Sequence, residues 1–201
     1  MLAAATDIIT PLWRGVVVLR VVTAAFAIAA IIVHHDGYAR PGLGWAALAG
    51  IVIWTVVICL AYSYDITRRI DVIGLDLLVT LGLMACSPLV LSTEQRIEPT
   101  TLLTTVWACG PVVAAAVHAG RIVGALAGAT VAVADVGVRG DFNTDIARDA
   151  LLLIGTGFVL GLVATAARRA TEQLRQAAHA EAATAERERL ARSIHDSVVQ
   201  V

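Results

Sequence analysis

The residues whose types and spacing best suit chemistry lie close to the C-terminal end of the sequence. His195 is followed directly by Asp196, and Gln200 stands four residues beyond that acid. In a helix, Asp196 and Gln200 share one face, and His195 flanks an apolar stripe. That stripe consists of Leu190, Ile194, Val198 and Val201. Two interpretations follow from the spacing: a site of phosphoryl transfer, or a solvated His that stands beside an acid.

Phosphoryl transfer would give each of the three side chains a separate task. A nitrogen of His195 can act as the nucleophile, and the carboxylate of Asp196 can orient the ring and accept its proton. The amide of Gln200 lies on the same face and can position a water molecule for the reverse hydrolysis.

A long polar helix is predicted to carry these residues. Residues 171–192 are rich in Ala, Glu, Gln and Arg and contain neither Gly nor Pro, a composition typical of stable helix. Its larger apolar residues are widely spaced, with Ala between them, so a parallel partner helix is needed to cover the Ala seam. We therefore expect one helix to continue from the last apolar segment into this tail and to pair with a second copy.

The rest of the chain has the composition of a membrane protein. Hydrophobic residues make up 58% of the 201 residues, charged residues only 15%, and the mean hydropathy is +0.80, whereas a soluble domain has about 25% charged residues. Each of six apolar runs is close to the ~20 residues that cross a bilayer, and such runs must be helical in lipid. They cover about residues 15–33, 43–62, 72–91, 101–117, 122–138 and 150–167. The net charge of −1 gives no basic field that would favour direct nucleic-acid binding.

The predicted fold is therefore all-α: a polytopic membrane protein with about six transmembrane helices, followed by a long cytoplasmic signalling helix. We expect a membrane sensor region over residues 1–167, a linker helix over 168–184, and the start of a dimerisation and phosphoacceptor domain over 185–201. The loops between the runs are short, so no folded extracellular sensor domain fits. A stimulus would act within the lipid bilayer, at its surface or through a partner.

Six crossings place both termini on one side of the membrane. Six arginines fall at run ends on that side: Arg14, Arg68, Arg69, Arg121, Arg168 and Arg169. Four fall on the other side: Arg40, Arg96, Arg139 and Arg148. Because basic residues are enriched on the cytoplasmic side of membrane proteins, we expect both termini in the cytoplasm, with the chain in the plasma membrane.

Three charged residues lie inside the apolar runs. A charge at the centre of a bilayer costs on the order of 3 kcal/mol, so each such charge favours a partner. We expect Arg20 of the first run to pair with Asp76 of the third; the alternative is that each reaches the interface separately. Asp135 marks either a polar pocket or a helix end that faces lipid headgroups.

Small residues suggest close helix packing, and nothing suggests a metal or cofactor site within this chain. Gly124–Gly128 and Gly157–Gly161 both have GxxxG spacing, which permits close approach of two helices but also reflects general enrichment of Gly. Three cysteines lie within apolar runs and lack CxxC spacing: Cys59, Cys86 and Cys109. His34 and His35 lack the further ligands that a metal site requires.

The segment Glu188-Arg189-Leu190-Ala191-Arg192-Ser193-Ile194-His195-Asp196-Ser197-Val198-Val199-Gln200 resembles the phosphoacceptor box of the NarX/DesK subgroup of sensor histidine kinases. The layout of several apolar runs before the box is similar to MacS-type members. The resemblance implies that His195 is autophosphorylated from ATP, that Asp196 acts as the acid or base, and that Gln200 positions water in the phosphatase reaction. Ser193 stands where the family often has Glu, and Val199 where a small residue is common.

The same resemblance implies partners and a cofactor. Members of the subgroup are homodimers that pass the phosphoryl group to an aspartate of a response regulator with a helix-turn-helix output domain. Their second bundle helix and ATP-binding domain, with ATP and Mg²⁺, would follow Val201, so we expect these 201 residues alone to be inactive or phosphorylated in trans. The alternative function is a non-enzymatic membrane transporter or scaffold with a cytoplasmic coiled-coil tail.

Overall fold

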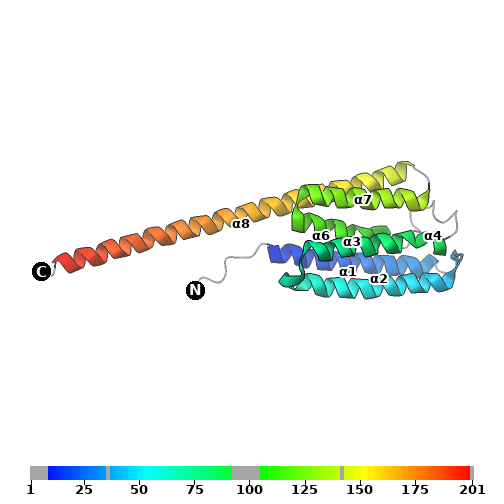
Figure 1. The fold of residues 1–201 in the computed structure, drawn as a ribbon, viewed down its shortest axis with the longest axis horizontal. Helices are drawn as coiled ribbons and strands as arrows, with labels where there is room; N and C mark the ends of the chain where they lie inside the picture. The colour runs from blue at the N-terminus through cyan, green and yellow to red at the C-terminus, as the bar shows by residue number, and fades with distance from the viewer. Residues whose placement is uncertain (1–8, 35–36, 92–104, 141–142, 200–201) are drawn as a thin grey trace.

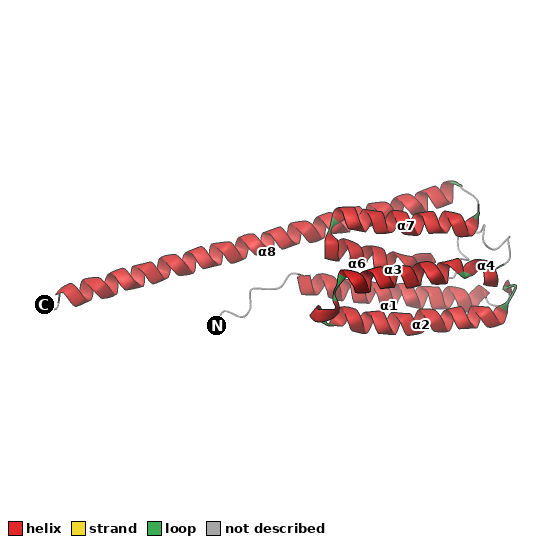
Figure 2. Cartoon of the chain, viewed as in Figure 1, coloured by secondary structure: helices red, strands yellow, loops and turns green. Residues whose placement is uncertain are grey.

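The structure is a computed structural model that describes residues 9–34, 37–91, 105–140 and 143–199. All regular elements of the described residues are helical, and no strand occurs among them (Figure 2). The α-helices are α1 (Ile9–His34), α2 (Pro41–Ser63), α3 (Ile70–Ala85), α4 (Ser87–Val90), α6 (Cys109–Ala119), α7 (Arg121–Arg139) and α8 (Thr144–Val199). Two 3₁₀ turns accompany them, η2 (Asp65–Thr67) and η3 (Thr105–Ala108).

The helices form a bundle from which one end of α8 projects (Figure 1). The short helix α6 occupies the centre of the bundle and touches α1, α3, α7 and α8. Every residue from Gly110 to Val117 is buried. Because protein surrounds α6, its backbone and side chains do not have to meet lipid along its length.

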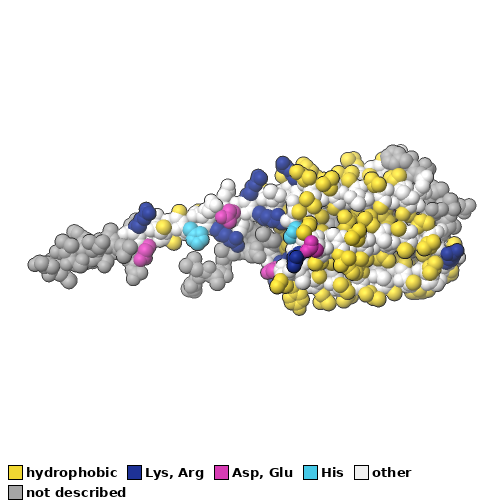
Figure 3. Space-filling view, viewed as in Figure 1, with side chains coloured by type: hydrophobic (Ala, Val, Ile, Leu, Met, Phe, Trp, Pro, Cys, Tyr) yellow, Lys and Arg dark blue, Asp and Glu magenta, His cyan; other side chains and the backbone are white. Residues whose placement is uncertain are grey.

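The surface of the bundle is apolar, while its interior holds charge. Val33, Val133 and Leu151 are among the large apolar side chains that are more than 70% exposed. On the face of the bundle that Figure 3 shows, hydrophobic side chains predominate, with charged side chains at its ends and along the projecting helix. Arg20 and Asp76, in contrast, are fully buried. This distribution fits a protein whose bundle is surrounded by lipid.

Within the described ranges, five helices are long and apolar enough to cross a membrane, and a sixth apolar helix is shorter. The five are the spans within α1, α2, α3 with α4, α7 and α8, and the shorter one is Val106–Ala119. Each of the six predicted runs thus contributes an apolar helix. The fourth differs most from the prediction, because its described part is a 3₁₀ turn followed by the 11 residues of α6.

Helix α8 begins earlier than the sequence pattern indicates. We expected residues 139–149 to form a loop, yet α8 starts at Thr144. The side chain of Asn143 accepts a hydrogen bond from the backbone N–H of Ile146 at 3.0 Å, which is the usual way that Asn caps a helix start. Arg148 and Asp145, which the pattern assigns to the loop, form an ion pair at 2.9 Å within the first turns.

After the bundle, α8 continues without interruption as one helix of 56 residues. This agrees with the predicted continuous helix. Thr171 is the last buried residue of its described side chains, and residues 172–184 are exposed on every face. The start of α1 and the projecting part of α8 lie at the same end of the bundle (Figure 1). We call this end, which contains Trp13, His118 and Arg168, the exit end, and the opposite one the far end.

The two GxxxG motifs form a seam of close contact between α7 and α8. A Cβ atom on Gly157 would lie 2.2 Å from the carbonyl oxygen of Gly124, and one on Gly128 would lie 2.6 Å from that of Leu153. Gly161 meets the backbone of Arg121 in the same way. Because these neighbours are backbone atoms, the helices would have to separate to admit a side chain. Of the two interpretations of the GxxxG spacing, the structure favours close approach of the two helices.

Substitution of Gly157 tests the seam directly. We expect Gly157→Ala to lower the free energy of unfolding by about 1–3 kcal/mol, the usual cost of overpacking, in a thermal or denaturant titration of the purified protein. Gly155→Ala is the matched control, because a Cβ atom there meets nothing within 4 Å. Equal stability of the two variants would show that α7 and α8 do not pack at this distance.

Candidate functional site

The guanidinium of Arg20 lies at the centre of the bundle, where it binds a carbonyl group that the local helix leaves without a donor. Arg20 Nη1 donates to the backbone oxygen of Trp107 at 2.9 Å. In an α-helix this carbonyl would accept from the N–H four residues later, but that residue is Pro111, which has no N–H. Arg20 of α1 therefore supplies the missing donor. Its Cζ atom also lies 4.1 Å from the centre of the Trp107 ring, a favourable cation–π distance.

Asp76 of α3 balances the charge of Arg20. Its Oδ1 forms an ion pair with Arg20 Nη2, and both side chains are fully buried. Trp54 Nε1 donates to the same oxygen at 2.8 Å, and the Tyr62 hydroxyl donates to Oδ2 at 3.0 Å. The predicted pairing of Arg20 with Asp76 is confirmed.

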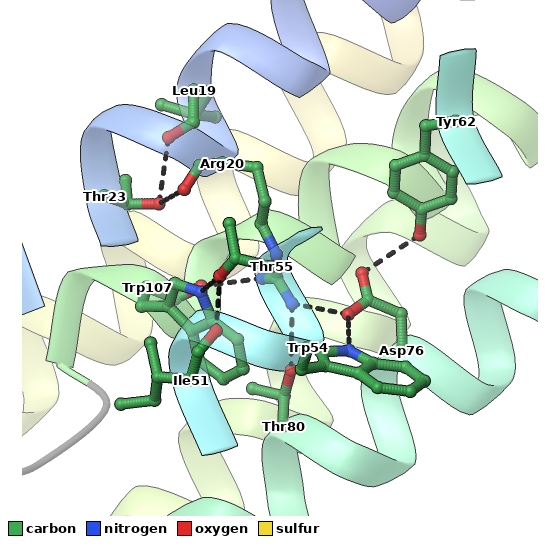
Figure 4. Close-up of polar contacts among 10 residues, drawn as sticks. All are labelled: Leu19, Arg20, Thr23, Ile51, Trp54, Thr55, Tyr62, Asp76, Thr80 and Trp107. Carbon is green, nitrogen blue, oxygen red and sulfur yellow. Dashed lines mark hydrogen bonds and ion pairs between the residues drawn. The ribbon is translucent and has the colours of Figure 1, made fainter. Parts of the chain in front are cut away.

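Two threonines complete this group of residues, which we call the core polar cluster (Figure 4). Thr80 Oγ1 lies 3.5 Å from Arg20 Nη2, and Thr55 Oγ1 accepts a hydrogen bond from Trp107 Nε1 at 3.0 Å. The cluster consists of Arg20, Trp54, Thr55, Tyr62, Asp76, Thr80 and Trp107. It joins α1, α2, α3 and η3, four segments that are distant in the sequence.

The core polar cluster depends on a glycine in α6. A Cβ atom on Gly110 would lie 2.1 Å from Arg20 Nη1 and 2.8 Å from its Cζ atom. A side chain at this position would therefore displace the guanidinium from Trp107. No sequence pattern indicates this role, because Gly110 belongs to no recognisable motif.

The polar groups of the core polar cluster bind mainly to one another, so the cluster links the helices that carry them. Both oxygens of the Asp76 carboxylate accept hydrogen bonds, and each terminal nitrogen of Arg20 donates. The Nε atom of Arg20 is buried without a hydrogen-bond partner in the described part of the chain, and no group of three potential metal ligands occurs among the described residues. The sequence pattern did not predict the aromatic members of the cluster, which are Trp54, Tyr62 and Trp107. A usable signal exists, because Trp and Tyr require a partner for their polar atom when they are buried in apolar surroundings.

A second polar feature lies toward the far end of the bundle. Arg139 Nε and Asp135 Oδ2 of α7 are 3.1 Å apart, and the two side chains are only 3% and 13% exposed. Both line a cavity of about 260 Å³. Of the two interpretations of Asp135, the structure therefore favours the polar pocket over a helix end that faces headgroups.

That cavity lies between helices and has a mostly apolar wall. Helix α8 provides Asp149, Leu152, Leu153 and Thr156, whereas α7 provides Val131, Asp135 and Arg139. The remaining lining residues come from α3, η3 and α6: Met84, Val106, Ala108, Cys109 and Val112. We call this space the far-end cavity.

At the exit end, one arginine ties α8 to the central helix. Arg168 Nη2 donates to the backbone oxygen of His118 at 2.7 Å and also to that of Val117. These carbonyls belong to the last turn of α6, where no intrahelical donor remains, and a cation is favoured there by the helix dipole. The neighbouring Arg169 is exposed.

The predicted phosphoacceptor residues lie far from these contacts. His195 and Asp196 are within α8, but their side chains, like those of all residues from 188 onward, lie outside what the structure describes. Gln200 also lies outside the described residues. His195 follows Arg168 by 27 residues, which corresponds to about 40 Å along a helix. Their assigned roles stay predictions.

Fold and contacts together define an all-helical protein with several helices that could span a membrane. Residues 3–175 match the model of a family of unknown function, DUF5931, and the chain belongs to that family. The matched region contains all six apolar segments and ends before the segment 185–201. No curated protein is similar to this chain, and no solved structure matches it.

A double-mutant cycle measures the connection between Arg20 and Asp76. We expect Arg20→Met and Asp76→Asn each to reduce the free energy of unfolding by about 3–5 kcal/mol, because each leaves a buried charge without its partner. The double variant leaves no unpaired charge, so its decrease in the free energy of unfolding should be smaller than the sum of the two single decreases by about 2 kcal/mol or more. Reversible unfolding of the purified protein in mixed micelles gives these values.

The exposed pair Arg69–Asp71 serves as the control for this cycle. Its side chains are 70% and 71% exposed at a separation of 3.0 Å, and the corresponding cycle of Arg69→Met and Asp71→Asn should give a coupling below about 1 kcal/mol. Additive losses at Arg20 and Asp76 would contradict the proposed connection.

Proposed function

We propose that this chain is the membrane input region and phosphoacceptor segment of a sensor histidine kinase of the plasma membrane. The observation that carries the proposal is the continuity of α8. One helix packs in the bundle, lines the far-end cavity, contacts α6 through Arg168 and then extends to His195. A rigid helix of this kind can convey a displacement or rotation at one end to the other.

The proposed kinase works as a homodimer. Residues 172–184 of α8 have no covering neighbour among the described residues, and Leu174 is 66% exposed. A helix that leaves a bundle with an Ala-rich seam and an exposed Leu would be stabilised by a parallel copy of itself. Dimerisation would also bring two phosphoacceptor segments together, as the resemblance implies.

In this proposal the exit end faces the cytoplasm. Arg14, Arg68 and Arg168 lie in segments of that end. Basic residues are enriched on the cytoplasmic side of membrane proteins. The phosphoacceptor segment would then meet ATP and a response regulator, both of which are cytoplasmic.

The proposed chemistry is phosphoryl transfer to an imidazole. A nitrogen of His195 attacks the terminal phosphorus of ATP, the bond to the bridging oxygen breaks, and ADP leaves while Asp196 accepts the imidazole proton. The phosphoryl group then passes to an aspartate of a response regulator with a helix-turn-helix output. Gln200 positions a water molecule when the regulator is dephosphorylated. ATP and Mg²⁺ would be bound by a catalytic domain outside these 201 residues.

Replacement of His195 tests the phosphoacceptor directly. The natural gene product, in membranes supplied with ATP labelled at the terminal phosphate, should acquire a phosphate that is stable in base and labile in acid. We expect His195→Gln to reduce this labelling to background, because Gln offers no imidazole nitrogen. His179→Gln is the matched control, since His179 is exposed on the same helix 16 residues earlier. Labelling that persists in His195→Gln would refute the assignment.

A further inference from the structure

The far-end cavity combines an apolar wall with acidic groups from two helices. Asp135 of α7 and Asp149 of α8 both line it, and their side chains are 13% and 37% exposed. Like charges that line one cavity repel each other, and partial burial weakens the screening by solvent. A cation placed between the two helices would relieve that repulsion.

Two arginines of the described residues contact these acids. Arg139 reaches Asp135 from the next turn of the same helix, with Nε 3.1 and 3.2 Å from the two carboxylate oxygens. Arg148 reaches Asp149 at 3.1 Å, but it is 56% exposed and does not line the cavity. The residues that line the cavity thus present two carboxylates and one guanidinium, an arrangement that is complementary to a positively charged ligand.

The rest of the cavity suits a hydrocarbon chain. Its inner wall includes the apolar side chains of Met84, Val112 and Val131. At its margin, Val106 is 46% and Leu152 59% exposed on the apolar surface of the bundle. An amphiphile can therefore enter from the surrounding lipid, with its hydrocarbon part against the inner wall.

We propose that the far-end cavity binds a cationic amphiphile whose ammonium group lies between Asp135 and Asp149. The occupant would touch α8 through Asp149, Leu152, Leu153 and Thr156, the first part of the helix that leads to His195. Its action as the stimulus rests on the proposed kinase function, whereas the binding itself does not.

A native cysteine reports on occupancy of the cavity. Cys109 lines the far-end cavity, whereas Cys86 is exposed and lies outside it. With the full chain in phosphatidylcholine nanodiscs, the rate of maleimide modification of each cysteine is followed by mass spectrometry, with octyltrimethylammonium as the probe. At a probe concentration about ten times its Kd, modification of Cys109 should slow about tenfold, and that of Cys86 should not change.

Two probes of equal chain length test the charge. Octanoate and octanol should protect Cys109 much less than the cation does. Equal protection by either would overturn the proposal, because it would show that hydrocarbon alone, or an anion, is bound. Absence of protection by the cation would overturn it as well.

Substitution of Asp149 tests the proposed contact with the ammonium group. Asp149→Asn should weaken protection by the cation about tenfold, because the quaternary ammonium, which has no N–H to donate, would lose the Coulomb attraction of one of the two carboxylates. Asp145→Asn is the matched control, because Asp145 is on the same helix and does not line the cavity. Equal protection in both variants would contradict the site.

Thermal unfolding provides a second measurement that does not require Cys109 to react. The cation should raise the Tm of the unmodified protein and of Asp145→Asn, and should raise that of Asp149→Asn less. An identical shift in all three proteins would overturn the proposal. Neither measurement involves phosphorylation, so failure of the site can be distinguished from failure of the proposed kinase function.

Discussion

Burial of the Arg20 guanidinium is the constraint on which the arrangement of the bundle depends. A cation at this depth requires an anion and several hydrogen-bond acceptors, and these come from different helices: Asp76 from α3 and the carbonyl of Trp107 from η3. Pro111 deprives that carbonyl of its helical donor, and Gly110 leaves room for the guanidinium. The central helix α6 is therefore fixed at its start by Arg20 and at its end by Arg168.

A bundle held in this way can pass a local change to α8. Helix α8 packs against α7 along the glycine seam, and Arg168 fixes the point at which it departs. The far-end cavity lies between α6, α7 and α8, so a molecule bound there would contact α7 and α8 at the end of the bundle opposite to Arg168. We propose that α8 responds as one body, since it contains no break between the cavity and His195.

The sequence predicted those parts of the structure that follow from strong physical constraints. Arg20 and Asp76 were paired because isolated charges in apolar runs are costly, whereas the spacing of Gly157 and Gly161 permitted the close helix contact without requiring it. The aromatic members of the core polar cluster could not be predicted, since Trp and Tyr in apolar runs are equally expected at membrane interfaces. The start of α8 was missed because Asp145 and Asp149 resemble loop residues until the cap at Asn143 is seen. The chemistry proposed for His195 still rests on the resemblance to the histidine kinase phosphoacceptor box and on the spacing of Asp196 and Gln200.

We propose that the bundle controls His195 through the rotational position of the continuous helix α8. Alanine insertions between Ala177 and Ala178, which are both exposed, test it most directly in the natural gene product, with His195 phosphorylation as the readout. Two inserted residues rotate the distal helix by about 200°, whereas seven return it to within about 20° of its original position. The account predicts that two residues change the level of phosphorylation severalfold and that seven preserve it. Equal levels in the parent and both variants would contradict the account.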